Sequence, residues 1–517
     1  MVSTANSYAA LSRRLDGITR TAVLKMPTFC GYSKQDISWR LIQRCAEYGV
    51  FRFTKTYAEK FYASGSLPED GDTVDCDGLR FVGDKRVTLS PMLFVRSFLA
   101  YLWHWTLAFA TIVFSLRLRC DNHKITLLYG VGIDNLTADG DDRRFVRFCR
   151  DGGVAPLSHR DRLAVQATQP VVSCTPASVR YGRVPLFIAL RWLGLSPSVW
   201  LYAIYHHASA MVSFVRAVLC YPAIILLERD FAYHAAALAM SHRGVLQDVV
   251  LTNSNYFSQP LWMWALSKRR HRSHIIWYSQ NSYPMAYMGD SVIAPIPNLR
   301  FIRADLQWVW TDSFKRFLEC IGCTSEIRVV GPIIWQLPDH VLQRESGNVR
   351  IAVFDVTPIN NATEREWGLI RSYYTELNAV RFINNIVEAA TKVGHELGKN
   401  VDIFLKHKRP HAAIHASTYL RLISDLEASG KIRLMLPTTN LYDLIDSCDL
   451  VIAIPFSSPA YVAASRNILC TWYDPTGKLL PLGDQDNGIP FINDTVRLAE
   501  LIRGCVRVRR SHSPPHQ

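Results

Sequence analysis

The sequence lacks the features that mark several common classes of protein. Its twelve cysteines are scattered, and only Cys320 and Cys323 form a C-x-x-C pair, with no second pair to complete a zinc site. Reduced thiols in a cytosolic compartment are therefore expected. The first residues contain no apolar segment of the kind that a cleaved signal peptide requires. No D-x-D motif follows a convincing strand, because Asp484 and Asp486 lie in a glycine-rich loop.

A recognisable nucleic-acid module is also missing, although the chain is basic. Its formal net charge is +14, and this suits nucleic acid, an anionic membrane surface or phosphorylated substrates. The run KRRHRSH at residues 268–274 has no interleaved aromatics. We therefore interpret it as the end of a surface helix and expect no nucleic-acid partner.

The chain has 517 residues, which is long enough for two or more domains. Its N-terminal half contains two long apolar segments. Residues 97–116 are uncharged and include Trp103, whereas residues 184–227 are interrupted by Arg191 and Arg216. Three interpretations stay open: buried or partner-packed helices, helices lying in a membrane interface, and a spanning helix. The basic charge and the tryptophans favour apolar helices at about 92–118 and 184–227 that attach to an anionic cytoplasmic leaflet.

Short apolar strands alternate with helices in the C-terminal part of the chain, which predicts a parallel sheet covered on both faces. A complete Rossmann-like domain is expected at residues 349–505, followed by a basic, disordered tail at 506–517. The expected strands are 350–356, 401–405, 432–436, 450–454 and 468–473. The expected helices are 381–397, 417–429, 441–447, 459–466 and 494–503.

Polar residues follow these strands, and ligands of parallel sheets bind beyond the carboxyl ends of the strands. Lys406, Lys408 and Arg409 follow one strand, and Ser457 and Ser458 open a helix, whose N-terminus attracts anions. A solvated basic turn and simple helix capping are the alternatives. The other residues at these ends are Asp355, Thr357, Pro437, Thr438, Pro455, Phe456 and Asp474.

Residues 1–335 are expected to form the other domain, with strands at 125–130, 248–252, 275–278 and 306–310. Asp134 follows the first of these strands, at a position where catalytic carboxylates often lie; a solvated turn is the alternative. The nearby G-x-G lacks the third glycine of a dinucleotide fingerprint.

Several segments together resemble bacterial surface-polysaccharide biosynthesis proteins of the GT-B glycosyltransferase type. They are LLYGVGIDN, WYSQNS, VVGP, FLKHKRP, PFSSPAYVAA and YDPTG, within roughly residues 120–500. The resemblance implies two Rossmann-like domains that face a cleft. It also implies sugar transfer from a nucleotide-sugar to a glycan or lipid-linked glycan acceptor, in capsule, O-antigen or similar assembly. The protein would be peripheral, at the cytoplasmic face of the inner membrane.

The resemblance also assigns roles to residues. Lys406, Lys408, Arg409, Ser457 and Ser458 would bind the donor phosphates, although His407 with Lys-Arg-Pro replaces the His-Pro of related enzymes and leaves the nucleotide open. Asp134 would be the catalytic base, with Glu228 or Asp230 behind it. Neither a metal nor a cofactor is expected. A sugar-nucleotide 2-epimerase and a non-catalytic membrane-associated assembly protein remain alternatives.

Overall fold

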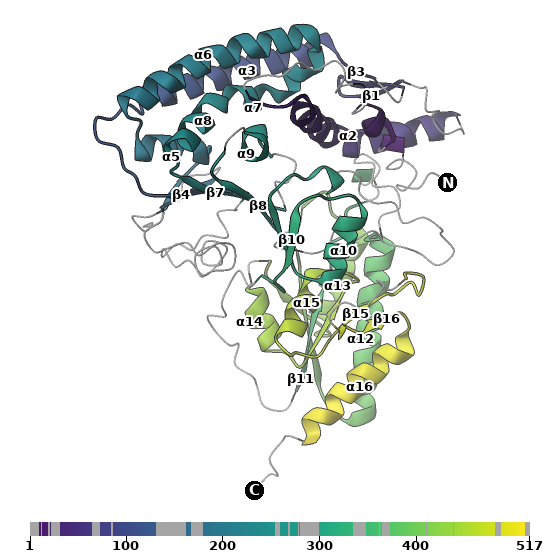
Figure 1. Cartoon of the computed structure of the whole chain (residues 1–517). Coiled ribbons are helices and arrows are strands. Elements are labelled where there is room, and N and C mark those ends of the chain that lie inside the picture. Colours follow the sequence, from purple (N-terminus) through teal and green to yellow (C-terminus); the bar gives the residue numbers. More distant parts are fainter. Residues whose placement is uncertain are drawn as a thin grey trace. The chain divides into compact units, whose positions relative to one another are not determined.

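The computed structural model divides into two compact units, the first within residues 1–335 and the second mainly residues 336–517, grouped with Trp310–Phe314. Each unit has its own parallel sheet, which confirms the predicted α/β fold class with two Rossmann-like sheets (Figure 1). The structure describes residues 10–11, 13–18, 21, 31–64, 73–83, 86–130, 162–166, 179–253, 259–266, 269–277, 279, 299–333, 348–360, 362–363, 373–408, 412–437, 439–480 and 488–511.

Six parallel strands form the sheet of the second unit, in the order β13-β12-β11-β14-β15-β16. Counted along the chain this is the order 3-2-1-4-5-6 of Rossmann folds. The central strands β11 and β14 are buried at every position, because helices cover both faces of the sheet. The strands are β11 (Val349–Phe354), β12 (Val401–Lys406), β13 (Arg433–Met435), β14 (Leu450–Ala453), β15 (Cys470–Tyr473) and β16 (Phe491–Ile492).

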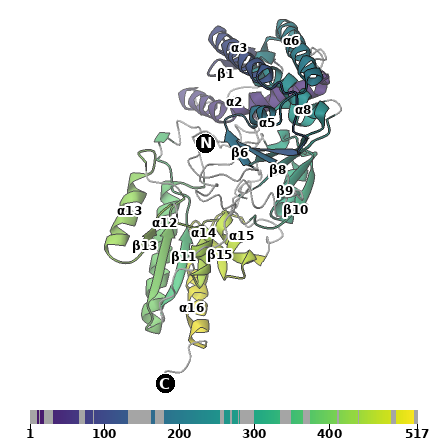
Figure 2. The ribbon, with the colours of Figure 1, turned by 90° about the vertical axis from the view of Figure 1, so that its left-hand side faces the viewer.

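Helices follow most of these strands, as predicted (Figure 2). Right-handed crossovers place α12 and α13 on one face of the sheet and α15 on the other, because the chain leaves β11 and β14 in opposite directions. Thr375 caps α12 by accepting a hydrogen bond from the Asn378 amide at 3.3 Å. The helices are α12 (Glu376–Leu397), α13 (Ser417–Ala428), α14 (Leu441–Asp446), α15 (Ser458–Ser465) and α16 (Thr495–Ser511).

The last helix is longer than predicted. Residues 506–511 were expected to belong to a disordered tail, but they continue α16. Cys505 and Val506 are buried, and α16 packs on α12, so apolar contact carries the helix past the expected end. Residues 512–517 lie outside the described residues.

The first unit contains seven parallel strands in the order β10-β9-β8-β7-β4-β5-β6, which repeats the Rossmann pattern with one added strand. The crossovers that follow β4 and β7 run in opposite directions along the sheet. The strands are β4 (Ile125–Tyr129), β5 (Arg162–Gln166), β6 (Val179–Gly182), β7 (Leu246–Thr252), β8 (Arg272–Ile276), β9 (Leu306–Val309) and β10 (Glu326–Val329).

The basic run at residues 268–274 was interpreted wrongly. Its last three residues begin β8, and His271 and His274 are buried rather than solvated. His274 reaches Asp248 on β7 at 2.8 Å. The buried carboxylate explains why a polar histidine lies inside the sheet.

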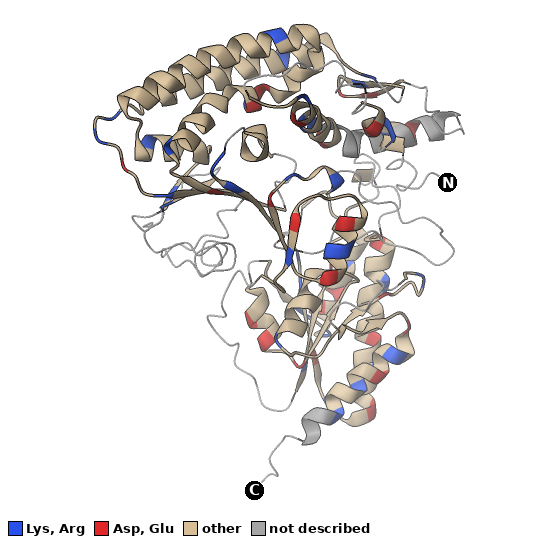
Figure 3. Cartoon of the chain, viewed as in Figure 1, with Lys and Arg blue, Asp and Glu red and all other residues tan. Residues whose placement is uncertain are grey.

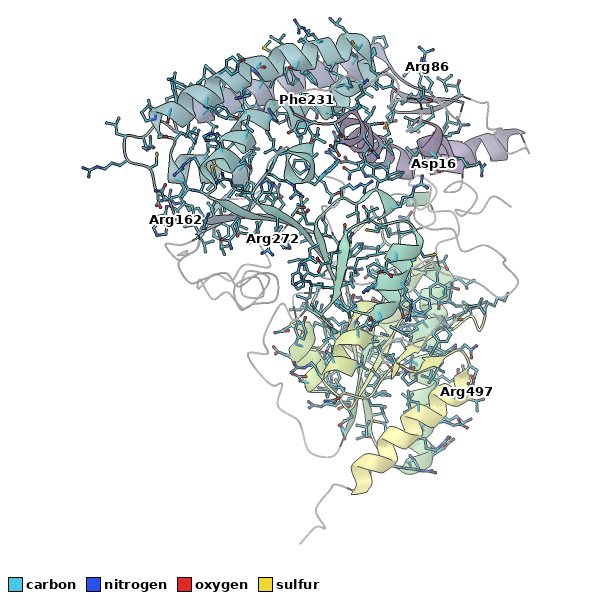
Figure 4. All side chains as sticks on the ribbon, viewed as in Figure 1. Asp16, Arg86, Arg162, Phe231, Arg272 and Arg497 are labelled. Carbon is cyan, nitrogen blue, oxygen red and sulfur yellow. The ribbon has the colours of Figure 1, made fainter. Side chains whose placement is uncertain are left out.

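Helices surround this sheet, and two of them are long and apolar. α3 (Pro91–Val113) and α6 (Pro197–Cys220) pack together, with the rings of Tyr101 and Phe214 stacked at 4.0 Å. Phe231, labelled in Figure 4, lies 5.1 Å from Phe214. None of the helices in the described part of the chain has the length and apolarity that crossing a membrane requires. The remaining helices include α2 (Lys34–Ser64), α5 (Pro185–Leu193), η2 (Pro222–Leu227), α7 (Glu228–Ala232), α8 (His234–Arg243), α9 (Leu261–Ala265), η4 (Leu299–Phe301) and α10 (Asp312–Cys320).

The region before α3 gave no clear sequence pattern. It folds as α2 and a small antiparallel sheet of β1 (Thr73–Cys76), β2 (Leu79–Val82) and β3 (Arg86–Leu89). Each strand has four residues, which is too short for alternation to stand out.

Candidate functional site

Most of the predicted donor-site residues lie at one edge of the second sheet, because all of its strands are parallel. Asp355 and Thr357 follow β11, Lys406–Lys408 end β12, and Pro455–Ser458 join β14 to α15. The crossovers from β11 and β14 run in opposite directions here, and ligands of Rossmann-like sheets bind at such a switch point. The predicted residues Asp134, Arg409 and Thr438 lie outside the described residues.

Asp355 is a buried carboxyl group, only 5% exposed. Its Oδ2 accepts a hydrogen bond from the hydroxyl of Tyr419 on α13. Its Oδ1 has no hydrogen-bond partner among the described residues. Burial raises the pKa of Asp355 to about 7, and the charges of Lys406 and Lys408 oppose this rise. The group therefore titrates near neutral pH.

The end of β12 places basic groups beside this carboxyl. The Nζ of Lys406 donates to the carbonyl oxygens of Pro437 at 2.8 Å and His407 at 3.4 Å. Burial lowers the pKa of Lys406, and the carboxylate of Asp355 raises it. The buried ring of His407 stands edge-on to Tyr419, with ring centres 6.4 Å apart. Lys408 is exposed.

The turn between β14 and α15 has an unusual backbone. Phe456 has a φ of 60°, a left-handed conformation that side chains other than glycine rarely adopt. Its ring is buried against Phe491, so Phe456 serves core packing. The Ser457 hydroxyl donates to Ile454 O at 2.7 Å and does not cap α15. A left-handed residue before a helix N-terminus orients backbone N–H groups as anion-binding turns do.

Asp474, predicted at the donor-site loops, has its carboxylate occupied by its own surroundings. It accepts hydrogen bonds from the Tyr373 hydroxyl at 2.6 Å and the Leu479 amide at 2.9 Å. The Thr476 amide and hydroxyl and the Lys478 amide donate to it as well. Asp474 thus fixes the loop after β15.

The first unit contains a cavity of about 840 Å³ near the carboxyl ends of β4, β5 and β7. Five arginines and two carboxylates line it, together with aromatic and aliphatic side chains of α3 and α5. His104 in its wall accepts a hydrogen bond at Nε2 from Arg229 at 3.2 Å and contacts the Tyr233 hydroxyl through Nδ1 at 2.8 Å. Burial lowers the pKa of His104 to about 4, so this histidine is neutral at pH 7.

The two carboxylates of the cavity differ in their surroundings. Asp230 is held by Arg40 at 3.1 Å and by the Leu261 amide, so both of its oxygens are engaged. Glu228 lies 3.6 Å from Arg44 and 3.9 Å from Arg229. Burial raises the pKa of Glu228. Of the two reserve candidates for the base, Glu228 is held less closely, because its ion-pair distances are longer than that of Asp230.

Sequence reasoning missed several residues of both sites. Tyr419 has helical spacing with its apolar neighbours and was indistinguishable from core. The cavity arginines Arg183, Arg191 and Arg229 come from segments far from β4 in the sequence. Their one signal was the charge of Arg191 within the apolar segment at 184–227, because Arg183 and Arg229 lie just outside that segment.

These features define an α/β protein of two Rossmann-like units. In the second unit, basic side chains lie at the carboxyl ends of the parallel strands. The family model for polysaccharide biosynthesis PFTS motif proteins matches residues 213–502. The match covers more than half of the chain, so the chain belongs to this family, and the predicted resemblance to polysaccharide biosynthesis proteins is confirmed. Within the match, residues 455–458 read PFSS, one residue different from the four letters of the family's motif.

No curated protein matches the chain in sequence. Among solved structures, the pneumococcal O-GlcNAc transferase GtfA, in complex with UDP and GlcNAc, is 12% identical over 54% of this chain and 54% of that chain, with a TM-score of 0.32. S. aureus TarM is 11% identical over 50% of this chain and 48% of that chain, with a TM-score of 0.30. The wall teichoic acid polymerase TagF is 12% identical over 81% and 90%, with a TM-score of 0.38. The chain spans about half the length of the first two.

Proposed function

We propose that this protein is a glycosyltransferase that moves a sugar from a nucleotide-sugar to a lipid-linked glycan acceptor in the synthesis of a surface polysaccharide such as capsule or O-antigen. One observation carries the proposal: Lys406, Lys408 and the turn before α15 lie at the carboxyl ends of β12 and β14, the two strands that flank β11. Membership of a polysaccharide biosynthesis family supports it.

The proposed donor site fits the charge that this reaction develops. Sugar transfer leaves a nucleoside phosphate, whose negative charge lysines and a helix N-terminus stabilise without a metal. Lys406, Lys408, Arg409, Ser457 and Ser458 would hold the phosphates. Thr357 adds a buried hydroxyl with no hydrogen-bond partner among the described residues. The surrounding loops would comprise Asp355, Thr357, Pro437, Thr438, Pro455, Phe456 and Asp474.

The acceptor is proposed to bind the first unit. In an inverting reaction a base removes the proton of the acceptor hydroxyl as its oxygen bonds to the sugar and the bond to the diphosphate breaks. Asp134 is the first candidate for this base and Glu228 the second. We propose that the reaction uses neither a metal nor a cofactor besides the nucleotide-sugar.

We also propose that the protein attaches peripherally to the cytoplasmic face of the inner membrane and that nucleic acid is not among its partners. The attachment is supported by a set of exposed apolar side chains, which we term the α3/α6 apolar surface. Arg96 and Arg216 are the only charged residues of these two helices (Figure 3). The surface comprises Met92, Val95, Phe98, Leu99, Trp103, Phe109, Leu201, Tyr205, Val212, Val215 and Leu219. Such a face suits the headgroup boundary of an anionic leaflet.

Nucleotide binding tests the donor site. Thermal shifts of the purified full-length protein would be measured with CMP, UDP, GDP, dTDP and ADP, for the wild type, Lys408→Ala and Lys399→Ala. Lys399 is an exposed lysine that precedes β12, whereas Lys408 follows it. We expect a shift with one nucleotide that Lys408→Ala weakens and Lys399→Ala keeps.

Turnover then tests the reaction. With the matching nucleotide-sugar and a membrane-lipid extract, labelled sugar should appear in lipid-linked product. Isomerised free nucleotide-sugar without transfer would favour a 2-epimerase. A folded protein that binds none of the five nucleotides would overturn the proposal and favour an assembly protein.

A further inference from the structure

The cavity of the first unit has more positive charge than its own residues neutralise. Its two carboxylates are already engaged, Asp230 by Arg40 and Glu228 by Arg44. Arg183 and Arg191 also line the cavity, and neither forms an ion pair with a described residue. The cavity therefore has guanidinium groups available for an anionic ligand. Guanidinium binds phosphate oxygens through paired hydrogen bonds.

The same cavity has an apolar wall. Trp103, Leu107 and Thr111 of α3 line it at intervals of four residues, which places them on one face of the helix. Phe187 and Ile188 of α5 also line it. Neutral His104 adds no charge on this side. The volume of about 840 Å³ lies within the usual range of ligand pockets.

Trp103 belongs both to the cavity and to the α3/α6 apolar surface. It lines the cavity, yet 67% of its surface is exposed. Val95, Leu99 and Trp103 follow one another at intervals of four residues, so an apolar strip of α3 leads to the cavity. A hydrocarbon chain that follows this strip would reach the arginines at its end.

We infer that this cavity binds the phosphate group of an amphiphile whose hydrocarbon chain leaves past Trp103 along the α3/α6 apolar surface. The inference rests on the proposed function, because it identifies the amphiphile as the phosphorylated lipid that carries the glycan acceptor. The phosphate would lie beside Arg183 and Arg191, and the chain against apolar side chains that otherwise face solvent.

Direct binding of defined probes tests this inference. Farnesyl pyrophosphate has both a phosphate group and a chain, farnesol lacks the phosphate, and inorganic pyrophosphate lacks the chain. Titration calorimetry of the full-length protein should show farnesyl pyrophosphate binding at least about tenfold more tightly than either of the others. Arg183→Gln and Arg191→Gln should each weaken it by about tenfold.

Matched variants separate the cavity from general charge. Arg86→Gln removes one arginine from a different cavity of the same unit and should leave binding unchanged (Arg86 is labelled in Figure 4). Trp103→Ala should weaken the binding of farnesyl pyrophosphate but not the binding of inorganic pyrophosphate. Equal affinity of wild type, Arg183→Gln and Arg191→Gln would overturn the inference.

The source of the phosphate is tested by competition. Phosphatidylglycerol vesicles that displace farnesyl pyrophosphate at equal phosphate concentration would assign the cavity to bulk phospholipid and overturn the acceptor assignment. Nucleotide thermal shifts of Arg191→Gln should match those of the wild type. Absence of a nucleotide shift in the wild type as well would instead point to failure of the donor-site proposal.

Discussion

Tyr419 on α13 donates a hydrogen bond to the buried carboxyl of Asp355 at the end of β11. Burial holds the pKa of this carboxyl at about 7, above its ordinary value of 3.8. The folded protein therefore binds the proton more tightly than the unfolded chain does. The stabilising contribution is complete at low pH and is lost as the pH rises from about 4 to about 7.

Asp355→Asn should therefore flatten the pH dependence of stability. We expect the melting temperature of the wild type to fall more steeply between pH 5 and pH 8 than that of the variant, because only the wild type ionises a buried group. Asp425→Asn, which alters an exposed carboxyl of α13, should keep the wild-type profile. Parallel profiles for the wild type and Asp355→Asn would contradict the raised pKa.

Asp474 should prove structural. Asp474→Ala leaves the Tyr373 hydroxyl and three backbone amides of its loop without their acceptor, so we expect a loss of about 3 kcal/mol in the free energy of unfolding. Tyr373→Phe removes one hydrogen bond and should cost about 1 kcal/mol. Urea unfolding measures both, and similar losses for the two variants would argue against the loop-fixing role.

The second sheet and its site edge were largely predictable from the sequence. Runs such as that at 450–454 are apolar at every position, and a strand buried on both faces produces this pattern. The turn residues that follow are polar or contain proline, so Lys406 and Ser457 could be placed at strand ends. Their hydrogen bonds could not be, because Ser457 bonds back to its own strand end rather than to the helix.

The cavity of the first unit could not be predicted in the same way. Arg183 and Arg191 belong to the stretch around α5 and Arg229 to α7, and only the tertiary fold brings them to the same cavity as Trp103. The burial of His274 could not be predicted either, because a basic run in the sequence does not indicate that a carboxylate lies opposite it on the neighbouring strand.

His274 should contribute strongly to stability through Asp248. The Trp308 indole donates to Nδ1 of His274 at 3.3 Å, so Nε2 carries the proton that Asp248 accepts. His274→Leu leaves the buried carboxylate without this partner and should cost about 3 kcal/mol in the free energy of unfolding. Arg272→Ala removes an exposed partner of the same carboxylate at 3.4 Å and should cost under about 1 kcal/mol. Equal costs would contradict the difference in burial.

Variants of Glu228 and Asp230 should distinguish a catalytic role from a structural one. Glu228→Gln should keep the melting temperature and lower kcat by about a hundredfold or more if Glu228 is the base. Asp230→Asn should instead lower the melting temperature, because Arg40 loses its buried ion-pair partner. If Glu228→Gln keeps its turnover and Asp134→Asn loses it, the base is Asp134.

Membrane attachment should depend on the α3/α6 apolar surface. Leu99 on α3 and Leu219 on α6 are 59% and 77% exposed, and the double variant Leu99→Glu/Leu219→Glu places two anions on this surface. We expect its partitioning to phosphatidylglycerol vesicles in a flotation assay to fall by about tenfold or more, because two apolar groups are lost and the new charges repel the lipid headgroups. Val496→Glu alters an equally exposed aliphatic residue on α16 of the second unit and should float with the vesicles as the wild type does. Equal flotation of both variants would remove this surface as the attachment site, and loss of flotation in Val496→Glu alone would move that role to the second unit.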